Sequence, residues 1–262
     1  MIEEVRRRAA PTSLSAAASA RLTPEPLIAP RMLPLLLAAV AGAVDATTFL
    51  ALFGLFVAQA TGSFVIVGVQ IITHDPTSLI RILAIPLFFA AGVGVGFLAI
   101  TQRHARKALT LSLGLEALLL LGYMLVGLTA GAFLQADTPA AAFAAAFGLL
   151  AMGVQSAAVR LTLRGVPSTN VMTSNTTQLA IDVAQWVMAS RRALAQTPDP
   201  AAPAMRAEAA ARIAGVLPIM AAFLLGSVGG GIGFASLGFW CLLPVILILL
   251  AVAGWALTPP GA

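Results

Sequence analysis

Three carboxylates lie within long stretches of this chain that are otherwise mostly apolar. They are Asp45, Glu116 and Asp182. A carboxylate at the centre of a membrane span costs about 2.5 to 3.5 kcal/mol, so such a group faces a cavity, takes up a proton or pairs with a partner. Because no basic residue is predicted at the depth of Asp45 and Asp182, we expect these two to carry a proton or to hold a cation.

Two of the carboxylates, Asp45 and Glu116, also have a purely structural interpretation. Asp45 can hydrogen-bond neighbouring hydroxyl groups and cap a break in its helix. Glu116 follows Lys107 by nine residues, and its side chain can therefore reach toward the cytoplasmic interface. For Glu116 we prefer this structural interpretation, whereas for Asp45 and Asp182 we prefer a binding site.

The densest polar cluster of the apolar region runs from Thr173 to Gln178. Hydroxyl and amide side chains can replace the water around a small solute or ion, and a break in the helix would expose backbone groups at the same depth. The alternative is ordinary helix packing, in which Ser and Thr bond to their own backbone, but six consecutive polar residues argue against it. The predicted binding residues are Asp45, Thr61, Ser63, Gln155, Ser156, Thr173, Asn175, Thr177, Gln178 and Asp182.

Other kinds of chemistry find no support in the sequence. There is one cysteine, Cys241, and there is no Ser-His-Asp set, HExxH motif or cluster of metal ligands. The glycines at 92–96 and 226–233 do not open a strand-to-helix unit and are typical of close helix packing. We therefore expect a protein that is not an enzyme and that needs no cofactor or metal.

Composition identifies the elements that must position these residues. Of the 262 residues, 60% are hydrophobic and only 10% are charged, and the mean hydropathy is +0.97. A soluble domain carries about 25% charged residues. The chain is thus predicted to be a polytopic membrane protein, which excludes a cytosolic enzyme, a nucleic-acid binder and a secreted scaffold. Its net charge of +5 indicates orientation in a membrane rather than binding to nucleic acid.

Eight apolar segments predict an all-helical fold, since most are about twice the length of a barrel strand. Two are unusual, because the second is short and the sixth opens with the polar run. The segments are Leu33–Phe53, Val57–Ile72, Ile82–Thr101, Leu109–Phe133, Thr138–Val159, Thr169–Ala189, Ile213–Phe234 and Phe239–Leu257.

The distribution of basic residues reduces these eight segments to six crossings. If all eight cross, the Lys and Arg residues divide ten to five between the two sides; if the second and sixth enter and leave on one side, they divide fourteen to one. Basic asymmetry across short loops determines orientation. We therefore predict six membrane helices, two re-entrant or broken helical segments, and both termini in the cytoplasm.

An internal repeat predicts the same topology. Gly42, Asp45 and Gly54 align with Gly153, Ser156 and Gly165 at an offset of 111. Each repeat then holds three of the six crossings. Because three is an odd number, the second repeat must be inverted in the membrane relative to the first. We predict a disordered cytoplasmic tail over 1–31, one repeat over 32–134 and a second over 138–258 that includes a cytoplasmic linker over 191–212.

The paired motifs resemble a known family. Gly42-Ala-Val-Asp-Ala46, Thr61-Gly-Ser63, Gly153-Val-Gln-Ser-Ala157 and Met172-Thr-Ser-Asn-Thr-Thr-Gln-Leu179 are similar to those of the YoaK-like bacterial inner-membrane proteins. The resemblance covers residues 33 to 257 and implies a membrane fold and a bacterial inner membrane, but no substrate. Ser63 and Ser156 stand where the family has Asn, and Ser174 where it has Gly, so ligand preference is expected to differ.

Inverted repeats with broken segments at matching positions are typical of secondary transporters. We expect a permease for a small solute or ion, with H⁺ or Na⁺ coupling, whose site lies between the two re-entrant segments. A channel that uses the same site, and a membrane scaffold or sensor that docks partners on the 191–212 linker, are the alternatives. The expected partners are the solute, the lipid bilayer and further copies of the chain, with no nucleic acid.

Overall fold

The computed structural model describes residues 25–58, 61–73, 82–102, 104–131, 138–195 and 199–258. Within these ranges the chain is helical apart from its connections and one isolated bridge between Leu27 and Leu163. The all-helical class is confirmed. The helices are α3 (Met32–Ala51), α4 (Thr61–Thr73), α6 (Ala84–Thr101), α7 (Ala105–Ala130), α8 (Pro139–Thr162), α9 (Met172–Ala193), α10 (Ala202–Leu237), the 3-10 turn η2 (Gly238–Cys241) and α11 (Leu242–Leu257).

Five stretches are long and apolar enough to cross a membrane. They are α3, α6, α7, α8 and the continuous stretch Ala202–Leu257, which contains α10, η2 and α11. The 13 residues of α4 span about 20 Å, which is shorter than the ~30 Å hydrocarbon core. The protein is therefore a helical membrane protein.

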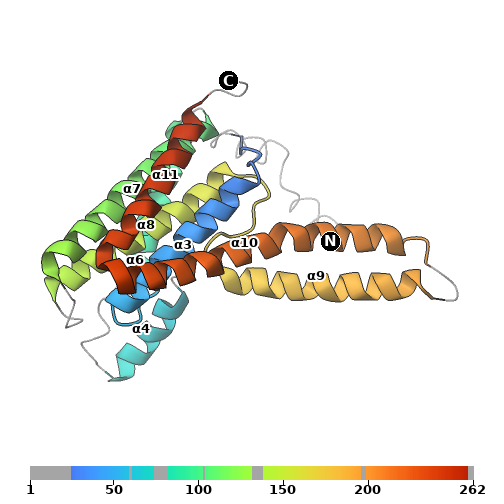
Figure 1. Ribbon diagram of the computed structural model, residues 1–262, viewed down its shortest axis with the longest axis horizontal. Helices are drawn as coiled ribbons and strands as arrows, with labels where there is room; N and C mark the ends of the chain where they lie inside the picture. The colour runs from blue at the N-terminus through green and yellow to red at the C-terminus, as the bar shows by residue number, and fades with distance from the viewer. Residues whose placement is uncertain are drawn as a thin grey trace, which may run out of the picture.

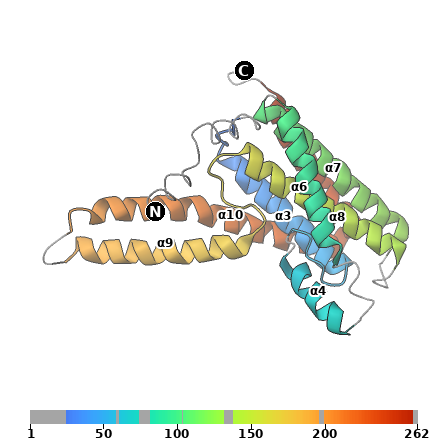
Figure 2. The ribbon, with the colours of Figure 1, turned by 180° about the vertical axis from the view of Figure 1, so that it is seen from behind.

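The helices run back and forth along a bundle, so the start of α3 and the end of α11 lie at the same end of it (Figures 1 and 2). At this end the backbone of Leu27 bonds the last turn of α8 (Leu27 N to Thr162 O, 2.7 Å), and Arg106 Nη1 donates to Thr258 O at 2.6 Å. We call this the basic end. It carries Arg31, Arg106, Lys107, Arg160 and Arg164, whereas the described residues of the opposite end include no Lys or Arg.

Glycines allow the closest helix contacts of the bundle. A Cβ on Gly42 of α3 would lie 2.1 Å from the Phe223 carbonyl oxygen of α10, and one on Gly226 of α10 would lie 2.1 Å from the Ala39 carbonyl oxygen of α3. Only glycine permits this approach of two backbones. The predicted packing role of the 226–233 glycines is thus confirmed for Gly226 and Gly230, the latter facing Ala43.

Helix α9 and the first half of α10 form an arm that projects from the bundle (Figure 1). The buried residues of α9 are Asn175, Asp182 and Ala189, spaced seven apart, and Ala202, Ala209 and Val216 repeat that spacing on α10. These two seams are small or polar, which allows the helices to pack closely along their length. The predicted break within 169–189 is wrong, because Met172–Ala193 is one continuous helix and the irregular backbone precedes it. Residues 202–212 of the predicted linker are the first turns of α10.

Candidate functional site

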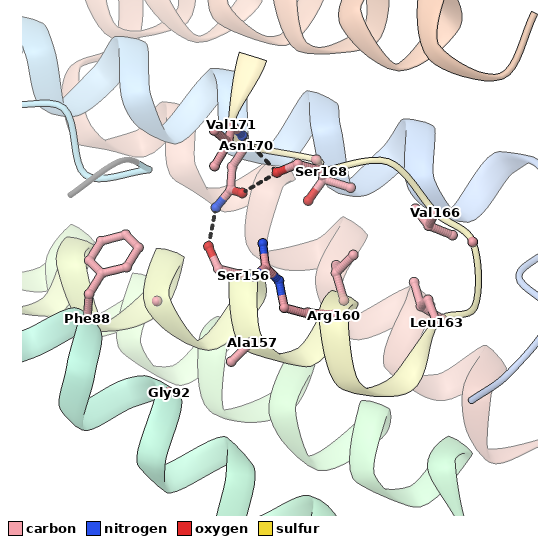
Figure 3. Close-up of a pocket in the computed structure, with 14 residues that line it drawn as sticks. Phe88, Gly92, Ser156, Ala157, Arg160, Leu163, Val166, Ser168, Asn170 and Val171 are labelled. Atoms are coloured by element: carbon pink, nitrogen blue, oxygen red, sulfur yellow. Dashed lines mark hydrogen bonds between the residues drawn. The ribbon is translucent and has the colours of Figure 1, made fainter. Parts of the chain in front are cut away.

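A cavity of about 430 Å³ lies between α6, the second half of α8 and the connecting segment 163–171 (Figure 3). Small residues leave this space open, since Gly92 of α6 and Gly153 and Ala157 of α8 contribute almost no side-chain volume. Gly165 has φ +67°, a conformation that favours glycine, and it turns the chain back over the end of α8. The lining residues are Phe88, Gly92, Gly153, Ser156, Ala157, Val159, Arg160, Leu163, Gly165, Val166, Ser168, Thr169, Asn170 and Val171.

A chain of hydrogen bonds orients the polar side of the cavity. Asn170 Nδ2 donates to Ser156 Oγ, and Ser168 Oγ donates to Asn170 Oδ1 at 3.2 Å. The Val171 N–H in turn donates to Ser168 Oγ at 3.0 Å. Because both ends of the Asn170 amide are held, its orientation is determined, and segment 163–171 is tied across the cavity to α8.

Gln155 supports the same wall from behind. Its Nε2 donates to Leu37 O of α3 at 2.8 Å and to Thr169 Oγ1 at 3.2 Å, and its side chain is fully buried. The Gln155 Oε1 has no hydrogen-bond partner among the described residues. Gln155 therefore does not line the cavity itself. It links α8 to α3 and to Thr169, which does line the cavity.

Arg160 is the charged residue of the cavity. Figure 3 shows its side chain rising from α8 toward Ser156 and Asn170. Within the described chain no ion pair joins Arg160 to a carboxylate, and no Asp or Glu stands among the lining residues. Arg160 also lies in the last turn of α8, where a cation is favoured by the helix dipole. The cavity thus presents positive charge and neutral hydrogen-bonding groups, which suits an anion.

Asp45 lies away from this cavity and holds a different connection. Its Oδ1 accepts hydrogen bonds from the backbone N–H groups of Val57 (2.8 Å) and Ala58 (2.7 Å), and the residue is 6% exposed. Two charge-assisted bonds to backbone donors stabilise the segment between α3 and α4. Thr47 and Thr48 bond instead to their own helix backbone. The geometry gives Asp45 a positioning role, and cation binding by it stays a prediction.

Most of the predicted polar run lies outside the cavity. Thr173, Thr177 and Gln178 are exposed on α9, and Thr177 Oγ1 donates to the Thr173 carbonyl at 3.1 Å. The exception is Asn175, which is buried and whose Nδ2 donates to Ser168 O at 2.7 Å. Ser174, Thr176 and Thr177 bond to their own helix backbone, as in the alternative that we set aside, because an unbroken helix offers a hydroxyl the carbonyl one turn earlier.

Asp182 has the basic partner that the sequence did not predict. Arg212 Nε donates to Asp182 Oδ1 at 2.7 Å, and Gln178 Nε2 donates to the same oxygen at 3.1 Å. α9 lies outside the five candidate spans, and there these bonds, that of Arg212 foremost, lower the pKa of the Asp182 carboxyl. The expectation of an unpartnered carboxylate was wrong because α10 begins ten residues before Arg212 and folds back along α9.

The remaining predicted residues are dispersed. Thr61 is exposed and Ser63 buried at the start of α4, and neither lines the cavity. Glu116 does not reach an interface: it is fully buried, and neither carboxylate oxygen has a partner among the described residues. Asp45 and Asp182 of the predicted binding set are also not brought together, since Asp182 lies on α9 of the arm and Asp45 on α3 of the bundle (Figure 1).

Sequence reasoning thus placed Ser156 at the site but left Arg160, Ser168 and Asn170 out of the binding set. One signal was present, because Ser156 and Arg160 are four residues apart in a helix and therefore lie on one face. Arg160 was instead counted only as a residue of a cytoplasmic loop.

The chain belongs to the family described as "Protein of unknown function (DUF1275)", whose model matches residues 33–255. This is the family of the YoaK-like proteins, so the resemblance is confirmed. No curated protein and no solved structure matches the chain.

Proposed function

We propose that this protein is a secondary transporter of a small anionic solute, built from two inverted halves with six crossings, and that the solute binds in the cavity between α6 and α8. The observation that carries the proposal is Arg160, an arginine without a carboxylate partner in the described chain that lines a partly open cavity of about 430 Å³ beside Ser156, Ser168 and Asn170. The six crossings are α3, α6 and α7 in the first half and α8, α10 and α11 in the second.

Matching backbone conformations support the repeat. Gly54 follows α3 with φ +80°, and Gly165 follows α8 with φ +67°. The two positions are 111 residues apart, the same offset that relates the surrounding motifs. A positive φ is uncommon outside glycine, so each half turns its chain by the same device after its first helix.

Matching side-chain bonds support it further. Asp45 of α3 binds the N–H of Ala58, and its counterpart Ser156 of α8 binds the side chain of Asn170. Ala58 and Asn170 are 112 residues apart. The same helix position in each half therefore ties the first helix to the connection that follows it.

The halves also interlock in a matching way. Gly42 of α3 abuts α10, and its counterpart Gly153 of α8 abuts Ala91 of α6. The first helix of each half thus packs at a glycine against the second membrane helix of the other half. A cavity bounded by α6 from one half and α8 from the other changes shape when the halves move against each other, which alternating access requires.

The charge distribution supports the orientation. Because Lys and Arg concentrate on the cytoplasmic side, we place the basic end, with the start of α3 and the end of α11, in the cytoplasm of a bacterial inner membrane. The cavity lies beside the last turns of α8 and therefore on the cytoplasmic half of the crossing. We propose that this conformation receives or releases the solute there.

The binding test uses the purified full chain and a panel of sodium salts: acetate, lactate, succinate, phosphate and sulfate. We expect at least one anion to raise the melting temperature of the protein, while sodium gluconate serves as a bulky reference. Arg160→Ala should raise the dissociation constant of that anion about ten- to a hundredfold, since it removes a charged hydrogen-bond donor. The matched control is Arg191→Ala at the tip of the arm. An equal response in Arg160→Ala and the native protein would refute the site.

Transport is tested separately in proteoliposomes with the anion that binds. A carrier shows saturable uptake and counterflow of labelled solute against an internal unlabelled pool, whereas a channel shows neither. Repeating the uptake with an imposed pH or sodium gradient identifies a coupling ion. Binding without any flux would favour a sensor instead.

A further inference from the structure

A second cavity, of about 610 Å³, lies on the other side of the connecting segment and holds two arginines. We call it the arginine groove. It is bounded by the start of α3, by segment 164–167 and by α10, where Ala211, Ala214 and Gly215 are too small to fill the space. The lining residues are Ile28, Ala29, Arg31, Pro34, Leu35, Arg164, Gly165, Val166, Pro167, Ala211, Ala214, Gly215, Pro218 and Ile219.

The two arginines of the groove, Arg31 and Arg164, have no carboxylate partner in the described chain. The ion pairs of the described chain involve Arg192 and Arg212 instead, and no Asp or Glu lines the groove. The backbone keeps the two arginine-bearing segments together, because Arg164 N donates to Leu27 O at 2.9 Å, four residues before Arg31. Two guanidinium groups at one cavity offer paired N–H donors of the kind that bind phosphate.

The groove lies at the level of a membrane interface. It is at the basic end, where the Arg106 guanidinium lies over the ring of Trp255 of α11, 5.2 Å from the ring centre. Tryptophan is enriched at the headgroup level of membrane proteins. Apolar side chains flank the mouth: Ile28 is 90% exposed and Met32 64% exposed. These side chains are suited to lipid and not to water.

An apolar hollow adjoins the groove on the next face of α3. It has a volume of about 340 Å³ and no charged lining residue. Its walls alternate along the helix with those of the groove, since Met32, Leu33 and Leu36 face the hollow while Arg31, Pro34 and Leu35 face the groove. A charged cavity for a phosphate therefore lies beside an apolar surface for an acyl chain.

We infer that the arginine groove binds the phosphate of an anionic phospholipid from the cytoplasmic leaflet, with Arg31 and Arg164 as its ligands and an acyl chain along the start of α3. Basic cavities between membrane helices on this side are suited to such headgroups. The bound lipid would join α3, segment 164–167 and α10, three parts that come from both halves of the protein. This inference does not depend on the transported solute.

The experiment measures lipid binding by the purified full chain in detergent. Dioleoyl phosphatidylglycerol, titrated in, should raise the melting temperature, while dioleoyl phosphatidylcholine and inorganic phosphate should not. Native mass spectrometry should show phosphatidylglycerol retained on the protein. Each single change, Arg31→Ala or Arg164→Ala, should weaken binding about fivefold, and the double change about thirtyfold. Arg191→Ala is the matched control.

A second variant tests the shape of the groove without removing charge. A Cβ at Gly215 meets no atom within 4 Å, so Gly215→Leu fills the groove while the helix stays intact, and it should also abolish phosphatidylglycerol binding. Equal stabilisation by phosphate and phosphatidylglycerol would overturn the lipid assignment in favour of a free-anion site. Unchanged lipid binding in both the double-arginine variant and Gly215→Leu would overturn the site itself.

Discussion

The two halves of the proposed repeat differ in the segment that follows the first helix of each. After α3, Phe49 and Phe56 bring their rings to 4.9 Å between centroids, and Asp45 binds the backbone of Val57 and Ala58. After α8, the position that matches Phe49 is Arg160, and a cavity lies open beside it. The first connection carries an aromatic pair and is held by a carboxylate, whereas the second carries an arginine and neutral polar side chains and lines a cavity.

The two connections share a backbone turn and a tie to the preceding helix but differ in the side chains that they carry. Both halves turn at a glycine and tie the connection to the helix, so the fold needs the tie and not a particular charge. Ser156 provides that tie without a negative charge, and an anion beside Arg160 therefore meets no carboxylate. Under the proposed function, the second connection forms the anion site, and the first lacks the arginine that such a site needs.

The largest expected effect concerns the close helix contacts at Gly42 and Gly153, which join each half to the other. Gly42→Ala places a methyl group 2.1 Å from a backbone oxygen, which the neighbouring helix can relieve only by moving, at about 1–3 kcal/mol or more. We expect loss of the monodisperse species in size-exclusion chromatography. Gly153→Ala should also destabilise, but less, because its nearest atom is the Ala91 side chain.

Gly94→Ala is the control for both changes, since a Cβ there meets nothing within 4 Å. Native behaviour of Gly42→Ala would mean that α3 and α10 are not packed this closely, and one of the matching features of the halves would be lost.

The next effect concerns the two ties. Asp45→Ala leaves two buried N–H groups without their acceptor, at about 1–3 kcal/mol, while Ser156→Ala removes one side-chain bond of about 0.5–1.5 kcal/mol. In thermal unfolding in detergent, the melting temperature of Asp45→Ala should therefore be well below that of Ser156→Ala. Asp45→Asn keeps an acceptor oxygen and should lie nearer the native protein. The reverse ranking would contradict the structural role of Asp45.

Exchanging the residue that distinguishes the connections should change binding more than stability. Arg160→Phe gives the second half the residue of the first, and we expect it to abolish stabilisation by anions. The side chain is exposed, so its effect on the melting temperature without ligand should be small, about 0.5 kcal/mol or less. A persistent anion effect would show that some other group binds the anion.

The second connection leads into an arm that the first lacks, and its pairing should depend on pH. Because the pKa of Asp182 is lowered in the folded protein, the pairing contributes stability above the ordinary carboxyl pKa, and this is lost as pH falls through the lowered value. Spin labels at Ala184→Cys and Ala210→Cys, in a Cys241→Ala background, should report a broader distance distribution in acid. Asp182→Asn should be broad already at neutral pH, and an equally narrow distribution in that variant would contradict the pairing.

The smallest effect has the opposite sign. Glu116 is buried without a partner in the described chain. Replacing an unpaired buried polar group by an apolar one of similar size is neutral or stabilising. Glu116→Met should therefore keep or raise the melting temperature, and a marked loss would mean that the carboxyl has a native partner.

The residue sequence determined the class of the protein and the repeat motifs by itself. Hydropathy identifies membrane helices because a helix satisfies its own backbone hydrogen bonds and must present apolar side chains to the hydrocarbon. Both requirements depend only on the residues of that helix. The predicted packing glycines were identified only in part: Gly226 and Gly230 meet the backbone of α3, whereas a Cβ at Gly92, Gly94 or Gly96 would meet no atom within 4 Å. Ser156 was predicted through its alignment with Asp45, which needs only the chain itself.

Pairing between distant residues was decided only by the tertiary structure. Arg212 reaches Asp182 because α10 is longer than a crossing and folds back on α9, and nothing in the local sequence of either residue states this. Arg160 becomes a cavity residue because segment 163–171 turns at Gly165 and brings Asn170 over α8. Composition and spacing describe which side chains a helix carries, but a site is formed by the surfaces that meet, and those depend on how the helices pack.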